Sequence, residues 1–169
     1  GKAIPGFALD EDGTVSYGYD AAGRLNGVSW GFGENAGKAA YDYLEASDLI
    51  GSLSIGDTIT SAYTYDAGRN QKTRLLNTVS GNTVSRYDYQ YDRLGRRIAV
   101  ETDGAAFAQA ALSRYNYNQR SELVEEQHFS SQNREPMADP VKARHRIYAY
   151  DPIGNRTESQ EGMTVSRYE

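Results

Sequence analysis

The chain has 169 residues, a formal net charge of −5 at pH 7 and no cysteine, a length that fits one domain or one piece of a larger array. Its arginines are scattered along an acidic chain, so no nucleic-acid partner is expected. The lack of cysteine excludes a disulfide framework and a thiolate metal site, and the lack of a run of 18 or more apolar residues predicts no membrane-spanning helix.

Tyrosine takes the place of aliphatic residues in this composition. Leu, Ile, Val and Phe number 29, about 17% of the chain, a level at which a charged sequence is typically disordered. The 14 tyrosines change this expectation, because each ring brings roughly 150–250 Å² of mostly apolar area and an OH group that can stay hydrated. The chain is therefore expected to be ordered, with an aromatic sheet face in place of a compact aliphatic core.

Thirteen of the tyrosines form Tyr-x-Tyr steps, and Tyr168 opens a further step. In chain order the steps are Tyr17/Tyr19, Tyr41/Tyr43, Tyr63/Tyr65, Tyr87/Tyr89/Tyr91, Tyr115/Tyr117 and Tyr148/Tyr150. The fullest form of the phrase is Tyr-x-Tyr-Asp-x-x-Gly-Arg/Asn, as in residues 17–24, and its spacing along the chain is 24, 22, 26, 26 and 33 residues. A phrase that recurs at such a period predicts a repeat architecture.

Two families of turns alternate along the chain. The first follows the tyrosines at Asp20–Gly23, Asp66–Gly68 (one residue shorter), Asp92–Gly95 and Asp151–Gly154. The second lies between phrases, at Asp12-Gly13, Gly56-Asp57, Gly81-Asn82, Asp103-Gly104 and Glu161-Gly162. In the first family Asp can accept hydrogen bonds from nearby backbone N–H groups and Gly can adopt a left-handed conformation. The dipeptides of the second family are strong signals for short hairpins.

Alternating turns predict an all-β, antiparallel meander of about a dozen short strands. The alanine-rich stretch Gly104–Leu112 is interpreted as strand or loop, because it is short and uncapped. Two units depart from the phrase, at Tyr41–Asp48 and at Tyr117–Ser121, and longer or different loops are expected there. Residues 130–145, which contain Pro136 and Pro140, are predicted to be an insertion between strands.

The two faces of the predicted sheet are expected to differ. Tyrosines at positions i and i+2 of a strand share one face, and the residues between them are small or polar, such as Gly18, Asp88 and Asn116. One face is therefore expected to be aromatic and the other hydrated. We also expect tyrosines of neighbouring hairpins to lie beside one another, with about 0.2–1 kcal/mol for each cross-strand aromatic contact.

The structural residues of the repeat are accordingly predicted to be its tyrosines, turn aspartates and turn glycines. They are Tyr17, Tyr19, Asp20, Gly23, Tyr63, Tyr65, Asp66, Gly68, Tyr89, Tyr91, Asp92, Gly95, Tyr148, Tyr150, Asp151 and Gly154.

These residues resemble the YD-repeat, or rearrangement hotspot (Rhs), family, named for the Tyr-Asp pair found here at Tyr19-Asp20, Tyr65-Asp66, Tyr91-Asp92 and Tyr150-Asp151. The resemblance covers residues 1–169 as a single array and implies a curled sheet of hairpins that is part of a hollow spiral β-shell. A sheet of about a dozen strands is also expected to curl on general grounds. The final residues repeat the sequence Ser85–Asp88, and we expect the chain to be a fragment of a larger shell.

The resemblance implies a structural role without chemistry. Shells of this family enclose a C-terminal toxin in bacterial Rhs proteins and insecticidal toxin complexes, and a similar shell is part of the teneurin adhesion receptors. The implied partners are flanking repeats of the same polypeptide and an enclosed C-terminal cargo, and the implied location is outside the cell or at its surface.

A binding module is the alternative. In it, the tyrosine face and the regularly spaced Arg24, Arg69, Arg96 and Arg156 would contact glycans or a cell-surface protein. The competing interpretation is that the rings pack within the sheet and that each arginine lies over an aromatic ring or pairs with a turn aspartate.

An enzymatic hypothesis depends on Asp151-Pro152-Ile153-Gly154, which resembles the DPxG self-cleavage motif of Rhs shells. The same four residues occupy the turn slot after Tyr148 and Tyr150, and a further repeat begins at Thr164. We therefore interpret them as a turn and predict no enzymatic activity. His128 and His145 lack the partners of a metal or catalytic site, and no cofactor is expected.

Overall fold

The computed structural model describes residues 13–32, 35–130, 141 and 144–168. This part of the chain contains 13 β-strands and no α-helix. The strands are β1 (Thr14–Tyr19), β2 (Leu25–Phe32), β3 (Asn35–Tyr43), β4 (Ile50–Ile55), β5 (Ile59–Tyr65), β6 (Lys72–Val79), β7 (Asn82–Tyr91), β8 (Arg97–Asp103), β9 (Ala111–Tyr117), β10 (Leu123–Ser130), β11 (Arg146–Tyr150), β12 (Arg156–Glu161) and β13 (Thr164–Arg167).

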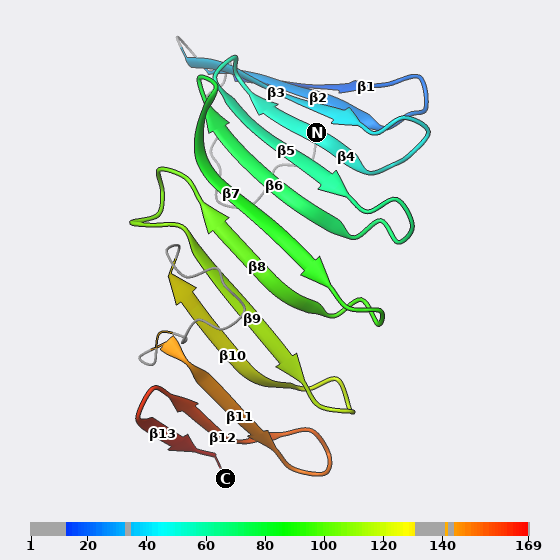
Figure 1. Ribbon diagram of the computed structural model, residues 1–169. Coiled ribbons are helices and arrows are strands. Elements are labelled where there is room, and N and C mark those ends of the chain that lie inside the picture. Colours follow the sequence, from blue (N-terminus) through cyan, green and yellow to red (C-terminus); the bar gives the residue numbers. More distant parts are fainter. Residues whose placement is uncertain (1–12, 33–34, 131–140, 142–143, 169) are drawn as a thin grey trace. The chain divides into compact units, whose positions relative to one another are not determined.

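The strands pair in chain order, from β1 to β13, in one open sheet (Figure 1). Consecutive strands run antiparallel within each of the two parts of the chain described below. The predicted all-β antiparallel meander is therefore confirmed. Most of the predicted insertion at 130–145 falls outside the described residues, as does Asp12 of the first Asp-Gly turn.

The chain divides into two compact units, which are described separately. The first comprises Gly1–Tyr63 with Asn77–Asn82, and the second comprises Thr64–Leu76 with Thr83–Glu169. Strands β1 to β4 belong to the first unit and β8 to β13 to the second, while β5, β6 and β7 contribute residues to both. That all 169 residues form one array of a larger shell stays a prediction.

The first unit has the expected difference between its two faces. Cross-strand partners on the tyrosine face form one apolar row, composed of Tyr17, Val28, Ala39, Ile55 and Ile59. Partners on the opposite face are mainly small or polar and include Ser16, Ser29, Lys38, Asp42, Ser52, Ser54 and Thr60. Here the period-two alternation of the sequence translates directly into an apolar and a polar face.

The second unit departs from this expectation. Three of its buried apolar residues, Ala99, Leu112 and Phe129, form one cluster. They lie on the face opposite the tyrosines, because Ala99 pairs with Gln90 while Tyr89 pairs with Val100. The prediction of a hydrated second face is therefore wrong for this unit. That prediction was based on the residues between the tyrosines, whereas the apolar side chains of this face come from the neighbouring strands β8, β9 and β10.

The alanine-rich stretch after β8 is a loop, as its interpretation allowed, and β9 begins at Ala111. The loop is fixed to the start of β7 by the amide of Ala106, which donates 2.8 Å to the carbonyl of Val84. It places the ring of Phe107 edge-on to Tyr87, at a centroid distance of 5.6 Å. The loop thus covers part of the tyrosine face of the second unit.

Candidate functional site

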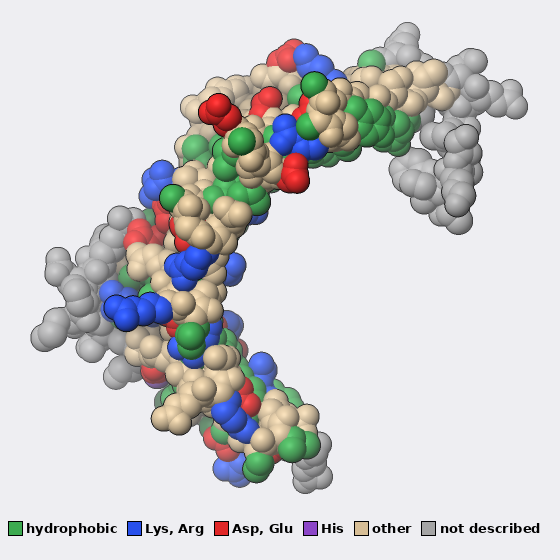
Figure 2. Space-filling model, turned by 90° about the vertical axis from the view of Figure 1, so that its right-hand side faces the viewer, with side chains coloured by type: hydrophobic (Ala, Val, Ile, Leu, Met, Phe, Trp, Pro, Cys, Tyr) green, Lys and Arg blue, Asp and Glu red, His purple; other side chains and the backbone are tan. Residues whose placement is uncertain are grey.

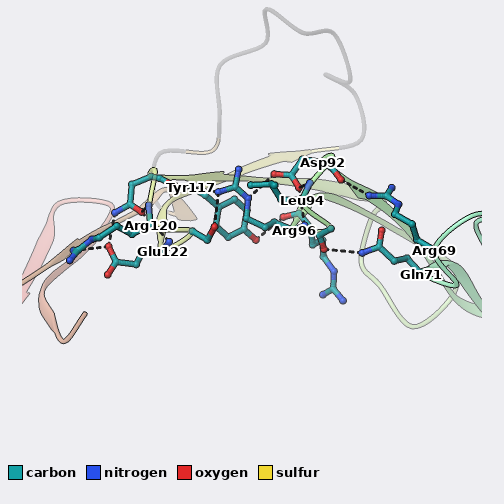
Figure 3. Close-up of polar contacts among 12 residues, drawn as sticks. Arg69, Gln71, Asp92, Leu94, Arg96, Tyr117, Arg120 and Glu122 are labelled. Carbon is teal, nitrogen blue, oxygen red and sulfur yellow. Dashed lines mark hydrogen bonds and ion pairs between the residues drawn. The ribbon is translucent and has the colours of Figure 1, made fainter. Parts of the chain in front are cut away.

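The turn at Asp92 shows why aspartate and arginine recur four residues apart in the repeated phrase. The Asp92 amide donates to the Arg96 carbonyl at 2.9 Å, and the Gly95 amide donates to the Asp92 carbonyl at 3.1 Å. Carboxylate oxygen Oδ1 accepts from the amides of Leu94 and Arg96, both at 2.9 Å, and Oδ2 accepts from Nε of Arg96 at 2.7 Å (Figure 3). One aspartate therefore organises the whole turn, because its two carboxylate oxygens accept from two turn amides and from the arginine four positions later.

The same pattern occurs at two other turns. Asp20 Oδ1 accepts from the amides of Ala22 and Arg24, both at 2.9 Å, and its Oδ2 accepts from Arg24 Nε at 2.7 Å. Asp151 Oδ1 accepts from the amides of Ile153 at 3.0 Å and Asn155 at 2.8 Å. At this turn Asn155 takes the position of the arginine, and its side chain donates to Asp151 Oδ2 at 3.0 Å.

Turns that depart from the phrase reach a similar geometry by other residues. The turn at Asp66 closes from the Asp66 amide to the Gln71 carbonyl at 2.9 Å, so it is one residue longer than the others and not shorter as the sequence indicated. The turn at Asn118 closes onto Glu122 at 3.0 Å and so has the usual length, although a longer or different loop was expected. Asn118 Oδ1 accepts two backbone amides just as the aspartates do.

Left-handed backbone closes each of these turns. Gly23, Gly95 and Gly154 have φ angles of 81°, 81° and 95°, which glycine adopts without steric cost. Gly68 is not left-handed. In the Asp66 turn the left-handed residue is Asn70, with φ of 56°, and in the Asn118 turn it is Ser121, with φ of 63°. The sequence indicated Gly23, Gly95 and Gly154 correctly, was wrong for Gly68, and did not show that Asn70 and Ser121 adopt this conformation.

The turn carboxylates are held in their ionised form. Burial acts to raise the pKa of Asp92, but hydrogen bonds from the side chain and amide of Arg96 outweigh it and lower that pKa below its usual range. For Asp20, the amide and side chain of Arg24 lower the pKa in the same way. The pKa of Asp151 is lowered as well, since the backbone and side-chain hydrogen bonds of Asn155 outweigh burial.

Arginine side chains connect each turn to the next one in the second unit. Arg69 Nη1 donates to the Asp92 carbonyl at 2.8 Å, and Gln71 Nε2 donates to the Gly95 carbonyl at 3.0 Å. From the Asp92 turn, Arg96 Nη1 donates to the Asn118 carbonyl at 3.3 Å (Figure 3). Figure 3 shows these side chains following one another from turn to turn; we call this set of contacts the turn ladder.

The ladder continues from the Asn118 turn and has a counterpart in the first unit. Arg120 donates to the carbonyls of Asp151 at 2.8 Å and Pro152 at 2.6 Å. In the first unit, Arg24 donates to the carbonyl of Ser47. Its guanidinium carbon also lies 4.3 Å from the ring centre of Tyr43, as that of Arg96 lies 4.8 Å from Tyr117. Each of these two arginines thus contacts its own aspartate, the next turn and the next tyrosine.

The second tyrosine of a step is a hydrogen-bond donor across the sheet. Its hydroxyl donates to the carbonyl of the first residue in the adjacent strand, at 2.8 Å from Tyr43 to Leu25, 2.8 Å from Tyr91 to Lys72, 2.7 Å from Tyr117 to Arg97 and 2.8 Å from Tyr150 to Leu123. Each acceptor strand belongs to the preceding hairpin. The tyrosine therefore fixes the register between hairpins, a role that the sequence did not reveal.

A β-bulge accompanies this tyrosine in five hairpins. The register shifts beside Tyr19, Tyr43, Tyr91, Tyr117 and Tyr150, leaving the extra residues Asn26, Gly51, Ile98, Val124 and Thr157. A bulge interrupts the alternation of faces and increases local twist. It explains why the strands after the turns lack a regular apolar period, and it brings Arg97 and Arg156 onto the tyrosine face.

Arginine, and not tyrosine, is the main stacking partner of the rings. Arg97 lies 4.6 Å from the ring centre of Tyr89, and Arg156 lies 4.6 Å from that of Tyr148. Tyr87 and Tyr89, on the same strand, are stacked with their ring centres 6.3 Å apart. That tyrosines of neighbouring hairpins lie beside one another stays a prediction, and the ring contacts between adjacent strands described here are cation–π contacts with arginine.

The remaining predicted tyrosines differ in exposure. Tyr17 and Tyr19 on β1 are 62% and 63% exposed, and Tyr63 and Tyr65 on β5 are half-buried. Figure 2 shows positive and negative side chains interspersed on the displayed face.

A serine and a histidine contact each other in the second unit, but the direction of their hydrogen bond does not suit catalysis. Ser113 Oγ lies 3.2 Å from His128 Nδ1, and Arg144 Nη1 lies 3.2 Å from His128 Nε2. Arginine can only donate, so Nε2 carries the lone pair and Nδ1 carries the proton. The imidazole then donates to Ser113 and does not activate it as a base would.

The described ranges hold neither a metal cluster nor a membrane-spanning helix. Residues 13–32, 35–130, 141 and 144–168 contain no group of three or more His, Cys, Asp or Glu placed to hold a metal ion. Within the same ranges, no helix is long and apolar enough to cross a membrane.

No protein-family model and no curated protein matches the chain. Among solved structures, it is similar to a chain of the Photorhabdus luminescens Tc holotoxin pore, with a TM-score of 0.72 and 19% identity over 92% of this chain. It also matches chains of two TcdB2–TccC3 crystal structures, with TM-scores of 0.48 and 0.45, identities of 12% and 10%, and coverage of 87% and 83% of this chain.

The likeness to the holotoxin chain shows a shared fold. The sequence resemblance named the insecticidal toxin complexes, so this prediction is confirmed at the level of fold. The chain spans 8% of that holotoxin chain, and 12% and 9% of the other two.

Proposed function

We propose that this chain is a stretch of wall in an Rhs-type shell, which encloses a C-terminal toxin or other cargo and has no chemistry of its own. The turn ladder is the observation that carries this proposal. In the second unit, backbone pairing, tyrosine hydroxyls and arginine side chains all join neighbouring hairpins. Such contacts stiffen a continuous sheet, which a container needs and an isolated binding domain does not.

The fold shared with the Tc holotoxin chain supports the same role. The proposal further includes flanking repeats on the same polypeptide, curvature into a shell, and export to the outside or the surface of the cell. The turn aspartates and glycines would set the geometry of the wall, and the tyrosines would lock one hairpin to the next.

One observation favours the alternative of a glycan-binding or cell-surface-binding module, namely the exposure of Tyr17 and Tyr19. The arginines weigh against it. Arg24, Arg69 and Arg96 are each paired with a turn aspartate, and Arg156 lies over Tyr148. These side chains would have to break internal contacts before contacting a sugar.

The test uses the full-length polypeptide, examined by electron microscopy and by limited proteolysis of the region after residue 169. A closed shell with internal density, and a C-terminal region that resists protease, is expected. The double variant Arg96→Ala/Arg120→Ala should expose that region, whereas the control Arg93→Ala, at an exposed turn position, should not. An open sheet whose C-terminal region is digested as fast as the same region expressed alone would refute containment.

A further inference from the structure

A pocket of about 600 Å³ lies in the second unit and takes no part in the turn ladder. It opens on the tyrosine face, because its floor residues Thr102 and Ala111 are in register with Tyr87. Its lining combines apolar groups with a guanidinium and an imidazole. The lining residues are Thr102, Ala106, Phe107, Ala108, Gln109, Ala111, His128, Val141 and Arg144.

The imidazole of His128 is neutral in this arrangement. Its Nε2 must accept from Arg144, because arginine can only donate, and its Nδ1 therefore donates to Ser113. The backbone supports this contact, since the Val141 amide donates to the His128 carbonyl at 2.7 Å and the Arg144 amide to the Val141 carbonyl at 2.9 Å. Arg144 is thus held with one N–H on the histidine ring.

The charges around His128 oppose a second positive charge. Burial lowers its pKa most, the charge of Arg144 lowers it further, Glu126 raises it, and Arg146 has the smallest effect and lowers it. Glu126, on the same strand, is already paired with Arg146 from β11 at 3.1 Å. From β9 the facing polar group is the uncharged Ser113, and from β8 the pocket receives the uncharged Thr102.

We propose that this pocket is an acid-dependent site for a carboxylate carried on a small apolar body. When the medium acidifies and His128 takes up a proton, Nε2 changes from acceptor to donor, so Arg144 loses its acceptor. The imidazolium of His128 and the guanidinium of Arg144 then both donate to the ligand carboxylate, because opposite charges attract and charge-assisted hydrogen bonds are strong. The apolar body of the ligand lies against Phe107, Ala111 and Val141, which line the same pocket.

Linkage fixes the sign of the effect. If acid raises the affinity for a ligand by protonating His128, then the bound ligand must in turn raise the pKa of His128. The two effects have the same coupling free energy. We expect affinity at pH 5 to exceed that at pH 7.5 by about tenfold, within the usual range of such coupling. This inference does not depend on the proposed shell function, because it concerns a site outside the ladder.

Benzoate is the probe, and the ring signals of His128 in the intact chain are followed by NMR during pH titration. Benzoate should raise the pKa of His128, whereas benzyl alcohol, which lacks the charge, and inorganic phosphate, which lacks the apolar body, should not. His145, which pairs with Glu125 at 2.8 Å, is the internal control. No benzoate-dependent change at His128 at pH 5 overturns the proposal.

Two variants separate the pocket from the rest of the surface. Arg144→Gln should abolish benzoate binding, and His128→Gln should abolish its dependence on pH. Arg97→Gln, on the same face but stacked on Tyr89, should bind benzoate as the unmodified chain does. Unchanged amide spectra identify the variants that remain folded, and benzoate binding that persists in a folded Arg144→Gln chain refutes the assignment.

Discussion

The hydroxyl of Tyr150 donates a 2.8 Å hydrogen bond to the backbone carbonyl of Leu123, the residue at which the adjacent strand β10 begins. The carbonyl belongs to the hairpin before Tyr150, so this bond joins two repeats. Because the same bond recurs at Tyr43, Tyr91 and Tyr117, it is a property of the repeat and not of one hairpin.

Tyr150→Phe removes this hydroxyl and leaves the ring in place. We expect the free energy of unfolding to fall by about 1 kcal/mol, the usual net contribution of one hydrogen bond. Urea denaturation measures the change. Tyr19→Phe is the matched control, since Tyr19 holds the same position in its step but is 63% exposed; an equal loss in both variants would contradict the role given to the bond.

Arg96→Lys tests the turn ladder. Lysine keeps the charge but cannot contact Asp92, the Asn118 carbonyl and the Tyr117 ring together, because it lacks the planar guanidinium. A loss of about 1 kcal/mol in unfolding free energy is expected from the weakened ring and carbonyl contacts. Arg93→Lys, in the same turn and exposed, should be neutral in the same denaturation experiment.

If Arg96→Lys proved as stable as Arg93→Lys, the contacts between turns would be incidental to the fold. Hydrogen exchange gives a second measurement, since the loss should be greatest for amides in the hairpins on either side of the Asn118 turn.

Gly95→Ala tests the left-handed turn position. Gly95 has φ of 81°, and an added Cβ would lie 2.7 Å from Nε2 of Gln71, which donates to the Gly95 carbonyl. We expect a loss of at least about 1 kcal/mol, since alanine disfavours this conformation. Gly68→Ala should be neutral or slightly stabilising, because Gly68 is not left-handed and nothing lies within 4 Å of its added Cβ. Equal melting temperatures for the two variants would disprove this assignment.

The sequence predicted the strands and turns well because both depend on local residues. Each Tyr-x-Tyr step fell on a strand, and Asp92 with Gly95 indicated a turn of the right geometry. The length of the Asp66 turn was wrong because Asn70, and not Gly68, adopts the left-handed conformation, and nothing in the local sequence distinguishes these two choices.

Contacts between hairpins were harder to predict, because they depend on register. The bulge residue Ile98 shifts the alternation of β8 by one position and so brings Arg97 beside Tyr89, which period-two reasoning cannot show. The one usable signal was the arginine that follows the turn glycine at Arg24 and Arg96. It suggested a contact with a ring or a turn aspartate, and the structure has both.

Acid should weaken the turns in a window set by their aspartates. The pKa of Asp92 is lower in the folded chain than its usual value of 3.8. A group with a lowered folded pKa contributes stability that is complete above the unfolded pKa and is lost as the pH falls through the folded one. Denaturation midpoints should therefore not change with pH near neutrality, where the contribution of the aspartates is complete, and should decrease below about pH 4.

Asp92→Asn separates this effect from other acid-sensitive groups. Asparagine keeps the Oδ1 acceptor, as Asn118 does naturally, but it does not titrate. The variant should be less stable at pH 7 and should lose less stability than the unmodified chain between pH 5 and pH 2. An identical acid dependence in both chains would show that Asp92 is not among the groups responsible.

Asp151→Asn distinguishes a turn residue from a cleavage residue. Asp151 uses Oδ1 for two backbone amides and Oδ2 for Asn155, and hydrogen bonds to the carboxylate keep its pKa low. A carboxylate engaged in this way is poorly suited to accept a proton or to attack the neighbouring peptide bond. We therefore expect the unmodified chain and the variant to stay equally intact during incubation, as measured by intact mass. A fragment that ends near Asp151 in the unmodified chain, and that disappears in Asp151→Asn, would replace the structural interpretation of this turn with self-cleavage.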